Sequence, residues 1–172
     1  VNGTAYLTTN AGKLYAVTGN VTTEPTQPSE PAITVGSGED ADHRTIQAAI
    51  ANASATDTVE VRPGTYDEDL TLNKNIVVAA PSGATLAGSL TTSRGNFIVR
   101  NLSIRGGVDA SYAGGGWELR NSTVNGTVDA YRAKGTWRIR NSTVDGGVNA
   151  RDTDGKWHIS NSTVEGEVDA YD

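Results

Sequence analysis

Charged residues recur every 20 positions in the second half of the chain, and their types bear on ion binding. The acidic set consists of Asp109, Asp129 and Asp169, with Asn149 in the remaining copy. The basic set consists of Arg100, Arg120 and Arg140. Carboxylates stacked about 5 Å apart repel one another unless cations or arginines screen them, so the acidic set is the candidate column for calcium, although no known calcium-loop spacing accompanies it. We interpret both sets as solvated faces and predict no metal and no cofactor.

An asparagine recurs with the same spacing, and three interpretations of it are open. The set is Asn101, Asn121, Asn141 and Asn161. We prefer an internal ladder at a bend, in which each amide hydrogen-bonds the amide of the next turn. Because Asn121-Ser122-Thr123 and its copies are N-glycosylation sequons, the column could instead carry glycans, which a buried amide cannot. Ice binding is the third interpretation, and we disfavour it because it needs an outward Thr-x-Thr array whereas each strand offers one Thr.

An aromatic column is the feature that most resembles a ligand-binding surface. It consists of Phe97, Trp117, Trp137 and Trp157. Aromatic rings spaced along a repeat could stack on sugar rings. However, Trp117 shares strand parity with Leu119, whereas Glu118 and Arg120 lie on the opposite parity. The alternation therefore predicts that the aromatic rings stack inside the core.

Neither histidine indicates a catalytic centre. His43 lies beside the predicted helix, and His158 occupies a variable outward position that Glu118 and Arg138 hold in other copies. No cluster of serine, histidine and acid recurs, and paired carboxylates arise in almost any acidic repeat protein, so they carry little information. We predict no catalytic residue and a protein that is not an enzyme.

The composition restricts the possible partners. Twenty Asp and Glu residues outnumber 14 Lys and Arg, which gives a net charge of −6 in 172 residues. This balance argues against nucleic-acid binding, because phosphates require a basic surface. No apolar run approaches the roughly 20 residues that a membrane span needs, and the lack of cysteine excludes a disulfide framework. The preference for Arg and Asp over Lys resembles that of surface proteins of halophilic archaea.

The first residue and the sequons together predict an extracellular or cell-surface protein. The chain begins with Val1 and contains no Met, which indicates a processed end or a fragment boundary. Eight Asn-x-Ser/Thr sequons occur. Outside the asparagine column, the candidate glycosylation sites are Asn2, Asn20, Asn52 and Asn125.

An internal repeat predicts the fold. Four segments beginning at Gly95, Gly115, Gly135 and Gly155 align without gaps. Within each, apolar and polar residues alternate with the period of a β-strand, and a unit of 20 residues cannot bury its apolar face unless it stacks on its neighbours. A propeller blade needs roughly 40 residues. The sequence therefore predicts an all-β chain, a right-handed parallel β-helix, with regular turns over residues 95–172. The glycines at 126, 146 and 166 are expected at tight turns with positive φ.

The segment before the regular repeats predicts a capping helix and irregular turns, together spanning residues 32–94. The helix is expected at about 42–54, with Asp42 or Thr45 as N-cap, and irregular turns at about 58–94. The phrase TIQAAI, followed by VEVRPGTYDE, resembles the N-terminal region of pectate-lyase-like and pectin-methylesterase-like right-handed β-helices. The resemblance implies a helix that caps the first turn. The esterases' catalytic aspartates and arginine belong to later turns, which the repeats occupy here, so the resemblance implies a non-catalytic member.

The first 31 residues predict a separate unit. Residues 1–23 are expected to form a β-hairpin with a turn around Asn10 to Lys13. This hairpin resembles one strand pair of a PQQ-type propeller blade. Residues 24–31 contain three prolines and predict an extended linker.

The unequal ends of residues 32–172 predict how the protein assembles. The first turn has a helical lid, whereas the chain stops in the middle of a repeat, which predicts an uncovered last turn. We expect head-to-tail association into filaments by a homo-oligomeric structural protein. The residues expected to take part are Tyr6, Leu7, Leu14, Tyr15, Val164, Val168, Ala170 and Tyr171. The alternatives are a β-helix that binds or processes carbohydrate, with surface glycans as partners, and a fragment of a larger surface protein.

Overall fold

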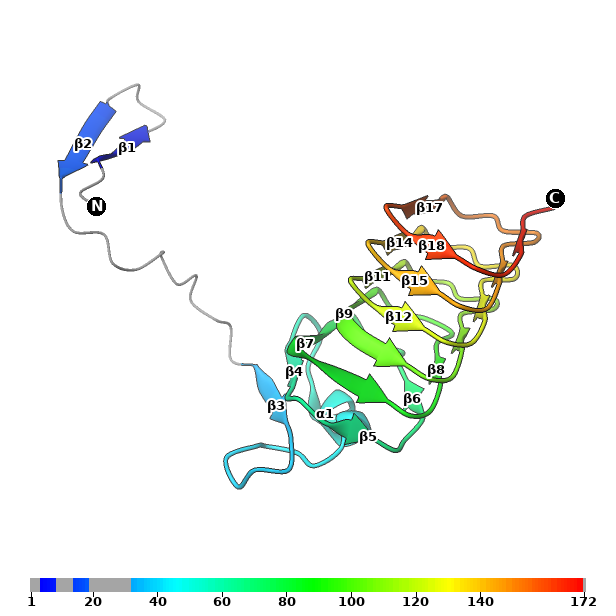
Figure 1. Ribbon diagram of the computed structural model, residues 1–172, viewed down its shortest axis with the longest axis horizontal. Coiled ribbons are helices and arrows are strands. Elements are labelled where there is room, and N and C mark those ends of the chain that lie inside the picture. The colour runs from blue at the N-terminus through cyan, green and yellow to red at the C-terminus, as the bar shows by residue number, and fades with distance from the viewer. Residues whose placement is uncertain (1–3, 9–13, 19–31, 172) are drawn as a thin grey trace.

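A computed structural model describes residues 4–8, 14–18 and 32–171 of the chain. From Ile33 onward the chain is a right-handed parallel β-helix, as the repeat predicts. Figure 1 shows its turns stacked from the helix α1 (Ile46–Asn52) to the last strands, β17 (Trp157–Ser160) and β18 (Thr163–Val164). The chain coils because each short strand hydrogen-bonds to the strand of the next turn, so that no turn is complete by itself.

Three columns of parallel strands run along the solenoid. The first column contains β3 (Ile33–Val35), β4 (Thr58–Val61), β7 (Ile76–Leu86), β9 (Phe97–Ile104), β11 (Trp117–Arg120), β14 (Trp137–Arg140) and β17 (Trp157–Ser160). The second contains β5 (Thr65–Tyr66), β7, β9, β12 (Thr123–Val124), β15 (Thr143–Val144) and β18 (Thr163–Val164). The third contains β6 (Leu70–Thr71), β8 (Leu90–Thr91), β10 (Val108–Asp109), β13 (Val128–Asp129), β16 (Val148–Asn149) and β19 (Val168–Asp169).

The register places like residues on top of one another. Trp117 pairs with Phe97 on one side and Trp137 on the other, and the Trp117 and Trp137 rings stack with their centroids 5.0 Å apart. Both indoles are almost completely buried. The prediction that the aromatic column lies in the core is confirmed for Phe97, Trp117 and Trp137, which are therefore not available to stack on sugars, whereas Trp157 in the last turn is partly exposed.

The capping helix is shorter than predicted. Helix α1 spans Ile46–Asn52, and Thr45, one of the two expected residues, is its N-cap. Ile46, Ala49 and Ile50 are its buried residues. Asp42 lies outside the helix because its carboxylate accepts hydrogen bonds from the backbone N–H and hydroxyl of Thr34 in β3, and these bonds lower the pKa of Asp42.

Glu68, in the phrase that resembles other β-helices, and Lys74, just after it, fasten α1 to the first full turn. The Glu68 carboxylate accepts hydrogen bonds from the backbone N–H groups of Ile46 and Gln47, at 2.7 and 2.9 Å. These donors have no partner within the helix, and they favour a negative charge. At the other end, Lys74 donates to the carbonyls of Ile50 and Ala51 in the helix and of Ala53, its C-cap. The phrase therefore performs a structural task in this chain.

The glycines at the turns are required for a different reason from the one predicted. Among the described glycines only Gly83 and Gly95 have positive φ. Gly126, Gly146 and Gly166 instead lie against the backbone of the preceding turn, where an added Cβ would approach backbone atoms to 2.6–2.8 Å. Close stacking, rather than a left-handed backbone, selects glycine at these positions.

Two strands of the predicted N-terminal hairpin are described, whereas its turn around Asn10 to Lys13 lies outside the described residues. Strands β1 (Thr4–Thr8) and β2 (Leu14–Thr18) pair antiparallel, with Thr4 opposite Thr18. The predicted linker, residues 24–31, lies outside the described residues.

Candidate functional site

The last turn exposes apolar side chains that earlier turns bury. Trp157 and Val168 are 40% and 42% exposed, whereas Trp137 and Val148, which occupy the same positions one turn earlier, are 0% and 1% exposed. Tyr171 is 68% exposed. A further turn of the same kind would cover Trp157 and Val168, as the last turn covers Trp137 and Val148.

The backbone of the last turn is also open. Strands β17, β18 and β19 each pair with one neighbour and end their columns within the described residues. Such an edge presents unpaired N–H and C=O groups to any chain that can add a strand. Among the other predicted contact residues, Val164 is half-buried and Ala170 is exposed. Tyr6 and Leu7 lie on β1, and Leu14 and Tyr15 lie on β2.

The opposite end is closed by its own chain. The outer edge of β3 accepts the segment around His43, since His43 N–H donates to Thr34 O and Gly36 N–H donates to His43 O. Helix α1 packs against β3, β4 and β6. Within residues 32–171 the two ends therefore differ, and the last turn is the one whose strand edge is unpaired.

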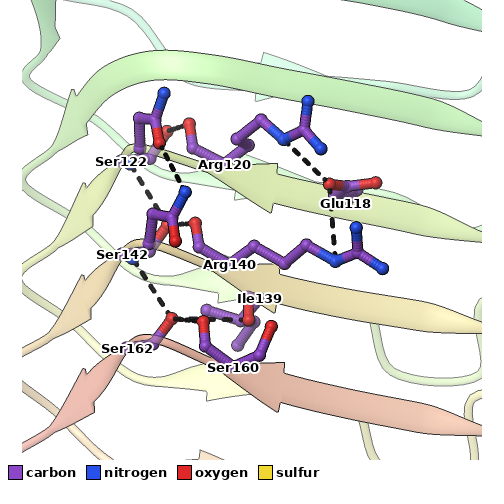
Figure 2. Close-up of polar contacts among 10 residues, drawn as sticks. Glu118, Arg120, Ser122, Ile139, Arg140, Ser142, Ser160 and Ser162 are labelled. Carbon is purple, nitrogen blue, oxygen red and sulfur yellow. Dashed lines mark hydrogen bonds and ion pairs between the residues drawn. The ribbon is translucent and has the colours of Figure 1, made fainter.

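A serine ladder, which the sequence analysis missed, joins consecutive turns at the bend after the first column. Ser122 N–H donates to Ser142 Oγ, and Ser142 N–H donates to Ser162 Oγ, both at 3.1 Å (Figure 2). Each Oγ in turn donates to the carbonyl two residues earlier. Ser122 and Ser142 are buried. Their recurrence at a 20-residue spacing, in the column that begins with Leu102, was the signal available in the sequence.

The prediction of an internal asparagine ladder is wrong in its placement. Asn121, Asn141 and Asn161 are exposed, and Asn101 is only partly buried. All four have φ between 49° and 57°, a left-handed conformation that Asn tolerates better than most residues. The Asn141 amide still donates to Asn121 Oδ1, at 3.3 Å on the surface. The bend thus directs the amides outward and the serines inward.

Replacing Ser142 with alanine is expected to cost about 1–3 kcal/mol of stability, because the buried N–H of Ser122 would lose its acceptor. Urea unfolding followed by circular dichroism measures the change. Ser111 is the control, since its hydroxyl bonds Asp109 in an exposed position, and its replacement by alanine should cost less than about 0.5 kcal/mol. Equal losses in the two variants would contradict the ladder's role.

The carboxylates of the acidic column make hydrogen bonds and an ion pair within the chain. Asp109 accepts from the N–H and hydroxyl of Ser111, and Asp129 accepts from the N–H of Tyr131 and the amide of Asn149. Asp169 forms an ion pair with Arg151. Within residues 32–171, no group of three or more acidic or histidine side chains is placed to hold a metal ion.

The outward side of β9, β11 and β14 carries arginines around one glutamate. Glu118 Oε1 lies 3.2 Å from Arg120 Nε and 3.9 Å from Arg140 Nε (Figure 2). These contacts are ion pairs without the alignment of a hydrogen bond. Arg100 continues the column through its pairing with Arg120, and His158 lies in register with Arg138. His43 lies in the loop before α1, remote in sequence from this face.

The other candidate glycosylation sites have different surroundings. Asn52 and Asn125 are exposed, and their amides donate to Ala48 O and Asp145 respectively. Asn2 and Asn20 lie outside the described residues.

The fold and its open edge define a class of protein, a repetitive β-solenoid of the right-handed parallel β-helix type. No protein-family model, no curated protein and no solved structure matches the chain. Among the described residues, no helix is both long and apolar enough to cross a membrane.

Proposed function

We propose that this protein is a structural β-solenoid of the cell surface or extracellular space that associates head to tail through its last turn. The observation that carries the proposal is the exposed apolar edge formed by Trp157 and Val168, whose counterparts one turn earlier, Trp137 and Val148, are buried. The proposal also keeps the resemblance to a non-catalytic pectate-lyase-like β-helix, which the structural use of Glu68 supports.

The occupant that fits this edge is the N-terminal hairpin of a second copy. Strand β17 has four residues, and β1 and β2 have five each, so that one hairpin strand can extend the first column along its full length. A two-stranded hairpin is marginal in water by itself and gains from adding to a sheet. The first turn of a second copy fits less well, because its β3 edge is already bonded around His43.

Such a contact joins two different surfaces, the last turn of one copy and the hairpin of the next. Contacts of this heterologous kind do not close on themselves unless a rotation forms a ring, so they propagate into a filament. The sequons support a surface location, since Asn121, Asn141 and Asn161 are exposed at the bend and accessible to a glycan.

Replacing Val168 with aspartate in the full chain is expected to abolish the end contact, because a carboxylate would be buried without a partner at the apolar edge. Light scattering coupled to size-exclusion chromatography should show concentration-dependent oligomers for the parent and a monomer for the variant.

Tyr112, which is 57% exposed on the side of the solenoid, is the control, and Tyr112→Asp should leave assembly unchanged. Leu7→Pro, which disrupts the pairing of Leu7 with Tyr15, should act like Val168→Asp. A parent chain that remains monomeric at all concentrations contradicts the proposal.

A binding module for carbohydrate is the second candidate, favoured by one observation. An open groove of about 670 Å³ crosses several turns beside the first column, with Asn75, Asn96, Glu118 and Arg138 among its lining residues. Amide and charged groups of this kind can bind sugar hydroxyls. Binding on a glycan array that Glu118→Ala removes would support this candidate.

A further inference from the structure

The outward face of the first strand column is positively charged in an acidic protein. We name as the arginine face Arg100, Arg120, Arg138 and Arg140. Glu118 is the one carboxylate at the outward positions of β11 and β14 and of the paired part of β9. The face therefore carries a charge of +3, and because the whole chain has a net charge of −6, the rest of the chain carries −9.

The register brings three of these guanidinium groups into one row. Arg100, Arg120 and Arg140 are directly paired across β9, β11 and β14, one sheet spacing of about 4.8 Å apart. Like charges directly opposite each other destabilise a sheet, and arginine cannot relieve the repulsion by losing its proton. One glutamate contacts two of the three, so the row keeps an excess of positive charge.

The arginine face also has unused hydrogen-bond donors. Arg100 Nε and Arg140 Nε are shielded from solvent and have no hydrogen-bond partner in the part of the chain that the structure describes. The side chains of Arg120 and Arg140 are nevertheless 40% and 37% exposed. An external carboxylate could pair with the exposed parts of the Arg120 and Arg140 side chains and supply the missing negative charge.

Two acidic residues one turn apart lie on another side of the solenoid, in its last two turns. Asp145 and Glu165 occupy one position of the repeat, at the turn between the second and third strand columns, and both are exposed. Their backbone N–H groups bond the carbonyls of the preceding turn, so their spacing along the solenoid is also one sheet spacing. Two carboxylates one sheet spacing apart can therefore meet two neighbouring arginines of the row at once.

We propose that solenoids also associate side by side, with the arginine face of one copy against the acidic turn of a second copy at Asp145 and Glu165. The equal spacing of the two rows and the excess of negative charge outside the arginine face identify a second copy as the partner. This lateral contact is separate from the end contact and does not depend on it. Because the two surfaces differ, lateral association adds copies in one direction and would produce layers or bundles.

Paired charge reversals test the proposal in the full chain carrying Val168→Asp, so that the end contact does not contribute. This parent should self-associate at about 0.01 M salt and dissociate at about 1 M, where the screening length falls from about 30 Å to about 3 Å. The double variant Arg100→Glu, Arg140→Glu should not self-associate, because its arginine face has lost its positive charge. The double variant Asp145→Arg, Glu165→Arg should not self-associate either, because its acidic turn has become basic. Sedimentation velocity measures the self-association of the parent and of each double variant at both salt concentrations.

Mixing the two reversed variants provides the decisive result. The acidified face of one variant then complements the basic turn of the other, so the mixture should associate at low salt although neither variant does alone. Circular dichroism melts establish that each variant is folded. A mixture that stays monomeric overturns the proposal, as does a parent that is monomeric at low salt. Binding of heparin or DNA by the parent without self-association also overturns it, because the partner would then be a different polyanion.

Discussion

Replacing Gly135 with alanine is expected to lower the free energy of unfolding by about 3 kcal/mol or more. A Cβ at this position would lie 2.1 Å from the carbonyl oxygen of Gly115 and 2.7 Å from the backbone nitrogen of Gly116. These atoms belong to the preceding turn and cannot move aside as a flexible side chain would. The turns must therefore separate, which weakens the hydrogen bonds of all three strand columns. Thermal unfolding followed by circular dichroism should show a fall in Tm of about 6 °C or more.

Gly114 is the matched control for this variant. It lies one position earlier in the repeat, and an added Cβ would meet its nearest atom, Ser93 O, at 3.9 Å. Gly114→Ala should therefore change Tm by about 2 °C at most. If Gly114→Ala and Gly135→Ala destabilise equally, the loss reflects glycine's backbone freedom and not the approach of adjacent turns.

The second large effect is expected at the centre of the aromatic stack. Trp137 is fully buried between Trp117 and Trp157, with ring centroids 5.0 and 5.5 Å away. Trp137→Ala should cost about 3–5 kcal/mol, because it leaves a cavity and removes two stacking contacts. Urea unfolding monitored by far-ultraviolet circular dichroism measures the loss without depending on tryptophan fluorescence.

Two further variants separate cavity formation from loss of the indole N–H. Trp137 Nε1 is buried without a hydrogen-bond partner, and Phe97 already occupies the same column one turn below Trp117. Trp137→Phe should therefore cost less than half as much as Trp137→Ala, since no hydrogen bond is lost. Trp157→Ala should also cost less, because this indole is 40% exposed. A cost for Trp137→Phe as large as that for Trp137→Ala would contradict the packing explanation.

The sequence by itself determined the repeating architecture of this protein. A period of 20 residues with alternating polarity permits few folds, because each turn is too small to bury its own apolar residues and must stack on a copy of itself. The same alternation placed Trp117 and Trp137 in the core and the arginines outside. The helical lid was also predictable, because its apolar residues recur on one face, although its first and last residues were not.

Only the tertiary structure decided how the bends are built and which surfaces remain open. Strand parity says nothing about a residue in left-handed conformation, so Asn121 was expected inside, where Ser122 lies instead. The reason for glycine at Gly146 likewise depends on the distance between adjacent turns, which no local pattern encodes. The row of Arg100, Arg120 and Arg140 becomes a charged surface only once the register brings together residues that are 20 positions apart along the chain.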